Sequence, residues 1–183
     1  TIGDYLSDEI STGPIANDSE EFITAEREAK EKLDTLINNN GSKSVDYFHK
    51  KLGKIMWNKC GMARNKMDLE SAIEEISKLR KEFWKDVKVP GDQNEFNEEL
   101  AKAGRVADFL ELGELFAKDA LEREESCGGH FREEYQTKEG EATRKKEFQF
   151  VSAWEYVGEP KNAILHKEKL EYENIEVKER SYK

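Results

Sequence analysis

The side chains best suited to chemistry are concentrated in the segment 122–135, which carries two arginines, a histidine, a cysteine and a Gly-Gly pair. The guanidinium and imidazole groups can donate hydrogen bonds to carboxylates or carbonyls. The two glycines let the backbone approach another surface closely, because glycine has no Cβ atom. Two interpretations are open. The glycines end a helix among ordinary surface charges, or the segment is a contact surface formed by Arg123, Ser126, Gly128, Gly129, His130 and Arg132.

Outside this segment the sequence lacks the residue spacings of known active sites. The histidines His49, His130 and His166 are scattered, and Cys60 and Cys127 form no Cys-x-x-Cys pair. There is no glycine-rich nucleotide loop, Gly-x-Ser-x-Gly elbow or His-Glu-x-x-His motif. We therefore expect no metal ligand, no catalytic residue and no cofactor-binding residue. Two cysteines cannot build a disulfide framework, so we expect small buried or half-buried thiols in a reducing compartment.

The charge balance excludes several partners. A net charge of −10 argues against nucleic acid and against an anionic membrane surface, which select clustered Lys and Arg. No apolar run approaches the ~20 residues that span a bilayer, and no signal peptide begins the chain. We expect a soluble protein without membrane insertion. Because residue 1 is Thr rather than Met, we also expect a piece of a longer protein.

Hydrophobic periodicity predicts four long helices that must position the segment 122–135. The first runs from Asp18 or Ser19 to the stop at 38–41, and the second from its cap at Ser44 to Gly61. The third begins at Asp68 and ends at 89–92, and the fourth runs from near Asn94 to the Gly-Gly pair. The fourth is expected to be the central core element, with Gly104 and Gly113 allowing close helix contacts. Trp57 is expected to anchor the core.

After Tyr135 the pattern changes to period two. Residues 148–156 include strong β formers in a period-two pattern, which predicts a first strand. Residues 158–162 form a turn. A second strand with a bulge is predicted from Leu170, Tyr172, Ile175 and Val177. The fold class is therefore mainly α: an antiparallel three- to four-helix bundle with a small C-terminal antiparallel β-ribbon. The expected divisions are a lead-in segment and first helix over 1–40, the bundle over 41–135, and a loop with the ribbon over 136–183.

Three stretches, 52–65, 108–117 and 123–135, resemble successive motifs of one family in the same order. They are similar to the C-terminal helical domain of the flavoprotein subunit of succinate dehydrogenase and fumarate reductase, and the resemblance extends from Val45 to the end. It implies a parent oxidoreductase that interconverts succinate and fumarate with FAD. Electrons would pass through an iron–sulfur subunit to or from quinone. The parent complex would be cytoplasmic and peripheral on the cytoplasmic face of the inner membrane.

In that family the catalytic arginines and histidines and the flavin-binding glycines lie upstream of this region. The resemblance therefore implies an inactive, structural piece that contacts the flavin and capping domains of the parent chain and the iron–sulfur subunit. Its docking seam to the flavin domain would consist of Arg123, Ser126, Gly128, Gly129, His130 and Arg132.

The sequence departs from the family pattern at two positions. Cys127 stands where the family usually has arginine, and Gly129 stands where it has alanine. A thiol cannot replace a guanidinium, so any arginine contact of the relatives is lost there.

Two alternatives stay open. One is the same domain of an L-aspartate oxidase, although the long tail over 148–177 favours the succinate and fumarate branch. The other is a stand-alone acidic helical adaptor whose ribbon and Gly-Gly-His loop bind a protein partner. The residues do not fix the physiological direction of the parent reaction, because the flavin environment and the quinone set the redox poise.

Overall fold

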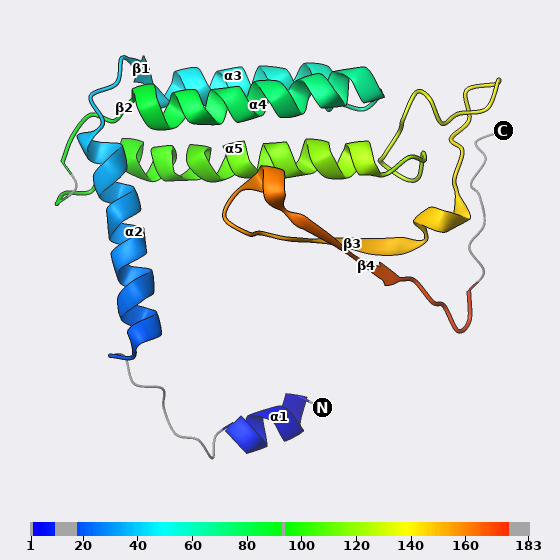
Figure 1. Cartoon of the computed structure of the whole chain (residues 1–183), viewed down its shortest axis with the longest axis horizontal. Helices are drawn as coiled ribbons and strands as arrows, with labels where there is room; N and C mark the ends of the chain where they lie inside the picture. The colour runs from blue at the N-terminus through cyan, green and yellow to red at the C-terminus, as the bar shows by residue number, and fades with distance from the viewer. Residues whose placement is uncertain (1, 10–17, 93, 176–183) are drawn as a thin grey trace.

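A computed structural model describes residues 2–9, 18–92 and 94–175 and confirms a mainly α fold with a C-terminal ribbon (Figure 1). The helices are α1 (Ile2–Glu9), α2 (Glu20–Asn38), α3 (Val45–Lys59), α4 (Lys66–Asp86) and α5 (Glu98–Glu122). The strands are β1 (Lys43–Ser44), β2 (Val87–Lys88), β3 (Phe150–Glu155) and β4 (Ile164–Lys169). Short 3-10 turns occupy η2 (Lys146–Phe148) and η3 (Pro160–Asn162).

The core lies among α3, α4 and α5, which run side by side with α4 antiparallel to its two neighbours (Figure 1). Each helix contributes apolar residues three or four positions apart, which places them on one face. Fully buried examples are Phe48, Ile76, Phe83 and Leu110. At Gly113 an added Cβ atom would lie 3.3 Å from Leu52 Cδ1 and 3.4 Å from Met56 Sδ, so α3 and α5 approach closely there. The same prediction is wrong for Gly104, where nothing lies within 4 Å.

Side-chain caps decide where the helices begin. Ser44 Oγ accepts a hydrogen bond from Tyr47 N (3.2 Å), which confirms the predicted start of α3. The predicted cap at Asp68 is wrong, because Asn65 Oδ1 accepts from Asp68 N at 2.9 Å and α4 begins at Lys66. The helix α5, predicted to begin near Asn94, begins at Glu98, and Asn97 caps it.

A short clamp joins α2 to the end of the bundle. β1 pairs with β2 in parallel, and Asp86 accepts from both Ser42 N (2.7 Å) and Ser42 Oγ (3.0 Å). An added Cβ atom on Gly41 would lie 2.1 Å from the Asp86 carbonyl group. Gly41 has no positive φ, so it is required here for the close approach of the two backbones and not for a left-handed conformation.

The helix α2 projects away from the bundle (Figure 1). Leu36 is the α2 residue that is fully buried, whereas Phe22 and Ile23 are half exposed and Leu33 is 43% exposed. The apolar face of α2 is thus mostly exposed to solvent. The core is formed by three helices rather than four. The short helix α1 exposes Ile2 and Leu6.

The prediction that Trp57 anchors the core is wrong. Its side chain is 84% exposed. The inward stripe of α3 is Val45, Phe48, Leu52 and Ile55, and Trp57 lies two positions beyond its last member, on a different face of the helix.

The ribbon combines one correct strand with one wrong strand. β3 lies within the predicted run 148–156, but its partner β4 is Ile164–Lys169 rather than residues 170–177. The η3 turn after Gly158 reverses the chain early, so pairing begins with Glu155 opposite Ile164. Tyr172 and Ile175 follow the strand and are exposed, and Val177 lies outside the described residues.

Polar contacts hold the ribbon on α5. Trp154 Nε1 donates to Asp119 at 2.9 Å, and Lys118 Nζ donates to the carbonyls of Pro160, Lys161 and Ala163 at 3.1–3.3 Å. Arg80 Nη2 donates to Glu159 at 2.5 Å, and its Nε lies 3.4 Å from the buried Glu114. A two-stranded ribbon is marginally stable in water by itself, and these contacts attach it to the helices.

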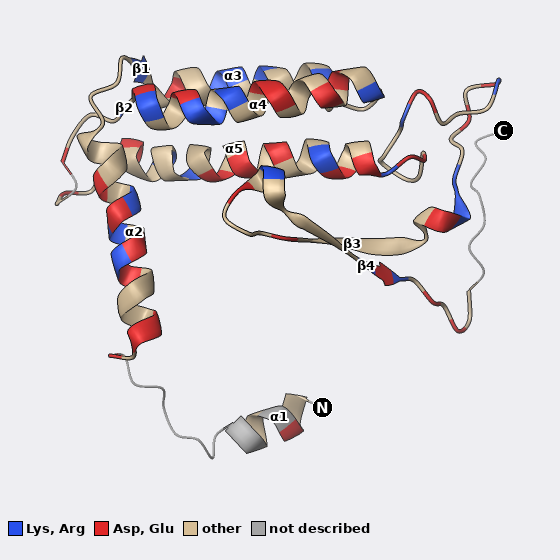
Figure 2. Cartoon of the chain, viewed as in Figure 1, with Lys and Arg blue, Asp and Glu red and all other residues tan. Residues whose placement is uncertain are grey.

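Basic and acidic residues are interspersed along α2 and α4 (Figure 2). Among the described residues, no helix is long and apolar enough to cross a membrane. The expectation of small buried thiols holds for Cys60, where burial raises the thiol pKa, and fails for Cys127, which is exposed.

Candidate functional site

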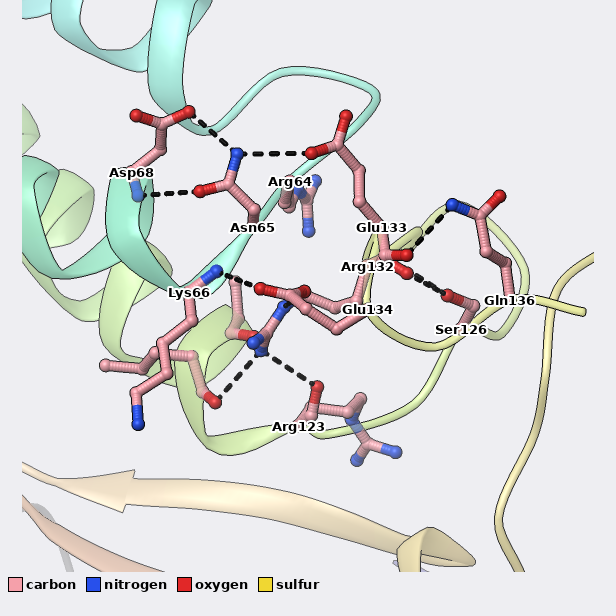
Figure 3. Close-up of polar contacts among 12 residues, drawn as sticks. Arg64, Asn65, Lys66, Asp68, Arg123, Ser126, Arg132, Glu133, Glu134 and Gln136 are labelled. Atoms are coloured by element: carbon pink, nitrogen blue, oxygen red, sulfur yellow. Dashed lines mark hydrogen bonds and ion pairs between the residues drawn. The ribbon is translucent and has the colours of Figure 1, made fainter. Parts of the chain in front are cut away.

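The segment 123–135 leaves the end of α5 and folds against the turn between α3 and α4 (Figure 3). Arg64 N donates to Phe131 O at 3.1 Å, and Glu133 N donates to Arg64 O at 2.8 Å. Two backbone hydrogen bonds thus join the α3–α4 turn to the segment. The predicted contact residues lie together where three elements meet: the ends of α5 and α3, and the start of α4.

Arg132 links two helix ends (Figure 3) and is only 1% exposed. Its Nη1 donates to the carbonyls of Ala120 (3.0 Å) and Leu121 (3.1 Å), which would otherwise lack partners at the end of α5. A cation at a helix C-terminus also interacts favourably with the helix dipole. Arg132 therefore caps α5 from outside the helix.

Glu134 continues this connection to α4. One carboxylate oxygen accepts from Arg132 Nε at 3.1 Å, and the other accepts from Lys66 N, the first residue of α4, at 2.5 Å. Burial opposes ionisation, but these donors outweigh it and hold the pKa of Glu134 below its ordinary value. The pair Arg132 and Glu134 thus joins the C-terminus of α5 to the N-terminus of α4.

Ser126 fixes the loop internally. Its Oγ donates to Arg132 O at 3.1 Å and accepts from Arg132 N at 2.8 Å, while its own N–H donates to Thr143 O at 2.9 Å. The side chain is 1% exposed. Ser126 thus positions Arg132 from within the loop.

Arg123 points the other way, toward the ribbon. Its Nη1 donates to Glu125 (2.9 Å) and to Phe148 O (3.0 Å), and its Nη2 donates to Phe150 O (3.1 Å). Glu125 is itself buried and accepts from Lys145 N at 2.9 Å. These contacts attach the start of β3 to the end of α5.

His130 lies between Arg123 and Arg64. Its Nε2 is 2.9 Å from Arg123 O, and its Nδ1 is 2.9 Å from Arg64 Nη1. A carbonyl only accepts and a guanidinium only donates, so the imidazole must be neutral with its proton on Nε2. Burial, followed by the charges of nearby arginines, lowers the His130 pKa and agrees with this assignment.

The Cys127-Gly128-Gly129 turn is the open part of the segment. Cys127 and His130 exchange two backbone hydrogen bonds, and Gly128 has a φ of 59°. A Cβ atom on Gly128 or Gly129 would meet nothing within 4 Å. Beside the turn is a shallow pocket of about 290 Å³ lined by Arg64, Phe116, Asp119, Ala120, Arg123, Cys127 and His130.

The hydrogen bonds of the site join α4, α5 and the ribbon. Both nitrogens of His130 are engaged, so neither is available as a base toward a ligand. No group of three or more His, Cys, Asp or Glu with metal-binding geometry occurs within residues 2–9, 18–92 and 94–175. Of the six predicted residues, Arg123, Ser126, His130 and Arg132 bind inside the chain, and the two glycines are exposed.

Three residues of the site were not singled out from the sequence: Arg64, Glu125 and Glu134. Arg64 is the second-last residue of the first family-like stretch, 52–65, which was the available signal. Nothing in the spacing distinguishes Glu125 and Glu134 from the other carboxylates of this acidic chain.

The fold matches part of much longer chains in solved structures. A quinol fumarate reductase of E. coli superposes with a TM-score of 0.72 at 21% identity, covering 88% of this chain and 27% of that chain. The Sdh1 complex of Mycobacterium smegmatis gives 0.71 at 21% identity, covering 90% and 27%. At this identity the structures establish the fold alone.

The sequence match is more specific. Residues 49–182 match the family model described as fumarate reductase flavoprotein C-term. The chain therefore belongs to the family of fumarate reductase flavoprotein C-terminal domains.

Individual relatives are consistent with this family. A fumarate reductase flavoprotein subunit of Haemophilus influenzae is 28% identical over 57% of this chain and 17% of its own length. One of Helicobacter pylori is 27% identical over 76% of this chain and 20% of its own length. An uncharacterized FAD-dependent oxidoreductase of Methanocaldococcus jannaschii is 31% identical over 75% and 26%. The chain thus spans between 17% and 26% of these curated relatives.

Proposed function

We propose that this chain is the C-terminal helical domain of a flavoprotein subunit that interconverts succinate and fumarate. The match of residues 49–182 to the family carries the proposal. In the proposed enzyme, FAD and the dicarboxylate bind to the flavin and capping domains. Electrons pass through an iron–sulfur subunit to or from quinone, and the complex is peripheral on the cytoplasmic face of the inner membrane.

The role proposed for this chain is structural. Hydrogen bonds join α4, α5 and the ribbon through the side chains of Arg132, Glu134, Arg123 and His130. These contacts favour a rigid structural unit over a reaction centre. The docking seam retains the Gly128-Gly129 turn as its exposed part. Cys127 stands where the family usually has arginine and supplies no guanidinium. The proposed seam therefore includes no arginine contact at this position.

The test uses the flavoprotein that contains this chain and, separately, the 183-residue chain. The flavoprotein is expected to bind FAD, to oxidise a reduced viologen dye with fumarate, and to reduce an artificial acceptor with succinate. The separate chain is expected to quench no flavin fluorescence and to show no turnover. Turnover by the separate chain would place the catalytic groups within it and contradict the proposal.

L-Aspartate is the informative alternative substrate. A flavoprotein that oxidises L-aspartate and not succinate would assign the chain to an L-aspartate oxidase. A reading frame that begins with Met directly before Thr1 and encodes no flavin-binding segment would instead favour the adaptor alternative.

A further inference from the structure

An apolar groove runs along the bundle between α3 and α5. It has a volume of about 300 Å³, and its lining includes His49, Gly53, Met56, Phe109, Leu112 and Phe116. Leu112 is 59% exposed, Phe116 46% and Phe109 44%. At Gly53 an added Cβ atom would meet nothing within 4 Å, so the α3 side of the groove is also open.

Trp57 extends this apolar surface along α3. It follows Gly53 by four residues, which places the two on the same side of the helix, and its indole is 84% exposed. Exposed tryptophan beside apolar neighbours is typical of interface anchors. An apolar groove flanked by large exposed apolar side chains is typical of a contact with another protein surface.

A guanidinium without an acidic partner lies at one end of the groove. Phe116 lines both the groove and the pocket beside the Cys127 turn, and the Arg64 guanidinium is 5.0 Å from the centre of the Phe116 ring. Arg64 Nε donates to Gly61 O and Nη1 donates to the neutral His130. Within the described part of the chain, Arg64 forms no ion pair with a carboxylate.

No carboxylate that lines the pocket forms an ion pair with this cation. Asp119 also lines the pocket, but it accepts from Trp154 Nε1, and Arg123 is paired with Glu125. A half-buried guanidinium with free donor capacity binds a carboxylate strongly and with defined geometry.

We propose that the groove and Arg64 form the face on which the flavin-bearing part of the same polypeptide docks, with apolar side chains in the groove and a carboxylate on Arg64. This inference rests on the proposed function and names the contact surface that the function requires. Two observations support this occupant: the unpaired cation at the end of an apolar tract, and the relatives' length, of which the match covers only 17% to 26%. The proposal moves the main contact from the Gly128-Gly129 turn to the adjacent α3–α5 face.

The experiment compares the separate chain with the whole flavoprotein by hydroxyl-radical footprinting and mass spectrometry. Oxidation of Trp57, Leu112 and Phe116 is expected to fall at least tenfold in the flavoprotein. Met67 is 76% exposed on α4 and serves as the apolar control, with unchanged labelling expected.

Arg64 is tested by its reaction with phenylglyoxal under the same two conditions. Phenylglyoxal is expected to modify Arg64 in the separate chain and not in the flavoprotein. Arg105, an exposed arginine of α5 with no ion pair among the described residues, is the matched control and should react in both. Arg64→Gln in the flavoprotein is expected to restore labelling of Phe116 while FAD remains bound.

The outcomes separate the two proposals. An active flavoprotein in which Trp57, Leu112 and Phe116 label as in the separate chain overturns the docking surface and leaves the proposed function intact. Failure to find any flavoprotein that contains the chain overturns both. Protection that occurs already in the separate chain and disappears on dilution assigns the groove to a second copy, and protection of the groove without protection of Arg64 overturns the carboxylate contact.

Discussion

At the scale of single residues, Arg132 shows how a buried charge can serve as a structural connector. Its guanidinium is surrounded by the carbonyls that end α5 and by the Glu134 carboxylate, so its desolvation is offset by several hydrogen bonds. Removing it would leave these acceptors without partners.

Arg132→Gln is therefore expected to lower the free energy of unfolding by about 3 kcal/mol, in the range for breaking a buried charged contact. Urea denaturation followed by circular dichroism measures the change. The matched variant Arg105→Gln should change the unfolding free energy by less than about 0.5 kcal/mol. Equal effects of the two changes would refute the connecting role of Arg132.

Trp57 provides the opposite case, because the structure replaces a core assignment with a surface one. Trp57→Ala is expected to change the unfolding free energy by less than about 0.5 kcal/mol, whereas Phe48→Ala in the core should cost about 3–5 kcal/mol. Both values come from the same denaturant titration. A large loss with Trp57→Ala would restore the core assignment.

His130 makes the stability depend on pH. Its pKa is lowered in the folded chain by burial, so the unfolded chain takes up the proton first as the pH falls. Stability from this group is complete above the ordinary histidine pKa of about 6.5 and decreases below it, by at most about 1.4 kcal/mol per pH unit.

Unfolding of the wild type and of His130→Gln at pH 7.5 and pH 5.5 isolates this effect, because all other groups titrate in both proteins. The wild type is expected to lose more stability than the variant between the two pH values. Equal losses would contradict a neutral, buried His130.

At the scale of elements, the ribbon depends on a few polar contacts with α5. Lys118 is the main one, since its ammonium group reaches three carbonyls around η3 and lies 4.7 Å from the centre of the Trp154 ring.

Lys118→Met is expected to increase amide hydrogen exchange of β3 and β4 at least tenfold while that of α3 and α4 stays unchanged. Hydrogen exchange with mass spectrometry detects the difference. Lys161→Met changes an exposed lysine of the same turn and should leave the exchange of both strands as in the wild type. Uniform protection after Lys118→Met would show that the ribbon is held by other contacts.

Periodicity located the helices because it directly reports which face is buried, and the buried faces carry Phe48, Leu52, Ile76 and Leu110. Helix starts were less accurate, since Asn65 and Asn97 compete with nearby Asp68 and Asn94 and only the local hydrogen bonds decide between them. The second strand was misplaced because Ile164 and Leu165 are a short apolar run, whereas 170–177 alternates more strongly. The tight η3 turn determined the pairing.

The six predicted contact residues lie in one segment at the end of α5, but their contacts could not be predicted from the sequence. Arg132 and His130 lie near in sequence to the helix end that they bind, so their proximity was predictable. Arg64 and Lys66 come from the distant α3–α4 turn, and only the packing of the bundle brings them to the segment. Glu125 is one of many carboxylates, and burial alone distinguishes it.

At the scale of the whole molecule, α2 adds little buried surface to the bundle. Removal of residues 1–34 is expected to change the unfolding free energy of the bundle by no more than about 1 kcal/mol, because the Lys32–Asp108 ion pair lost is exposed. Removal of residues 1–40 also deletes Leu36, which is fully buried, and should cost about 2–5 kcal/mol more. Urea titrations of the two shortened chains measure both values, and a large loss already with the shorter deletion would show that α2 packs on the bundle.

The contacts of Arg132 and Glu134 with the ends of α5 and α4 have a consequence for the folding kinetics. α3 and α4 are joined by a short turn and can form a hairpin early, whereas the contacts of Arg132 and Glu134 with two helix ends require α5 to be already in place. We expect these contacts to form after the rate-limiting step of folding. In that case Arg132→Gln would mainly accelerate unfolding and leave the refolding rate nearly unchanged. The contacts of Arg132 and Glu134 would then determine how long the native bundle persists.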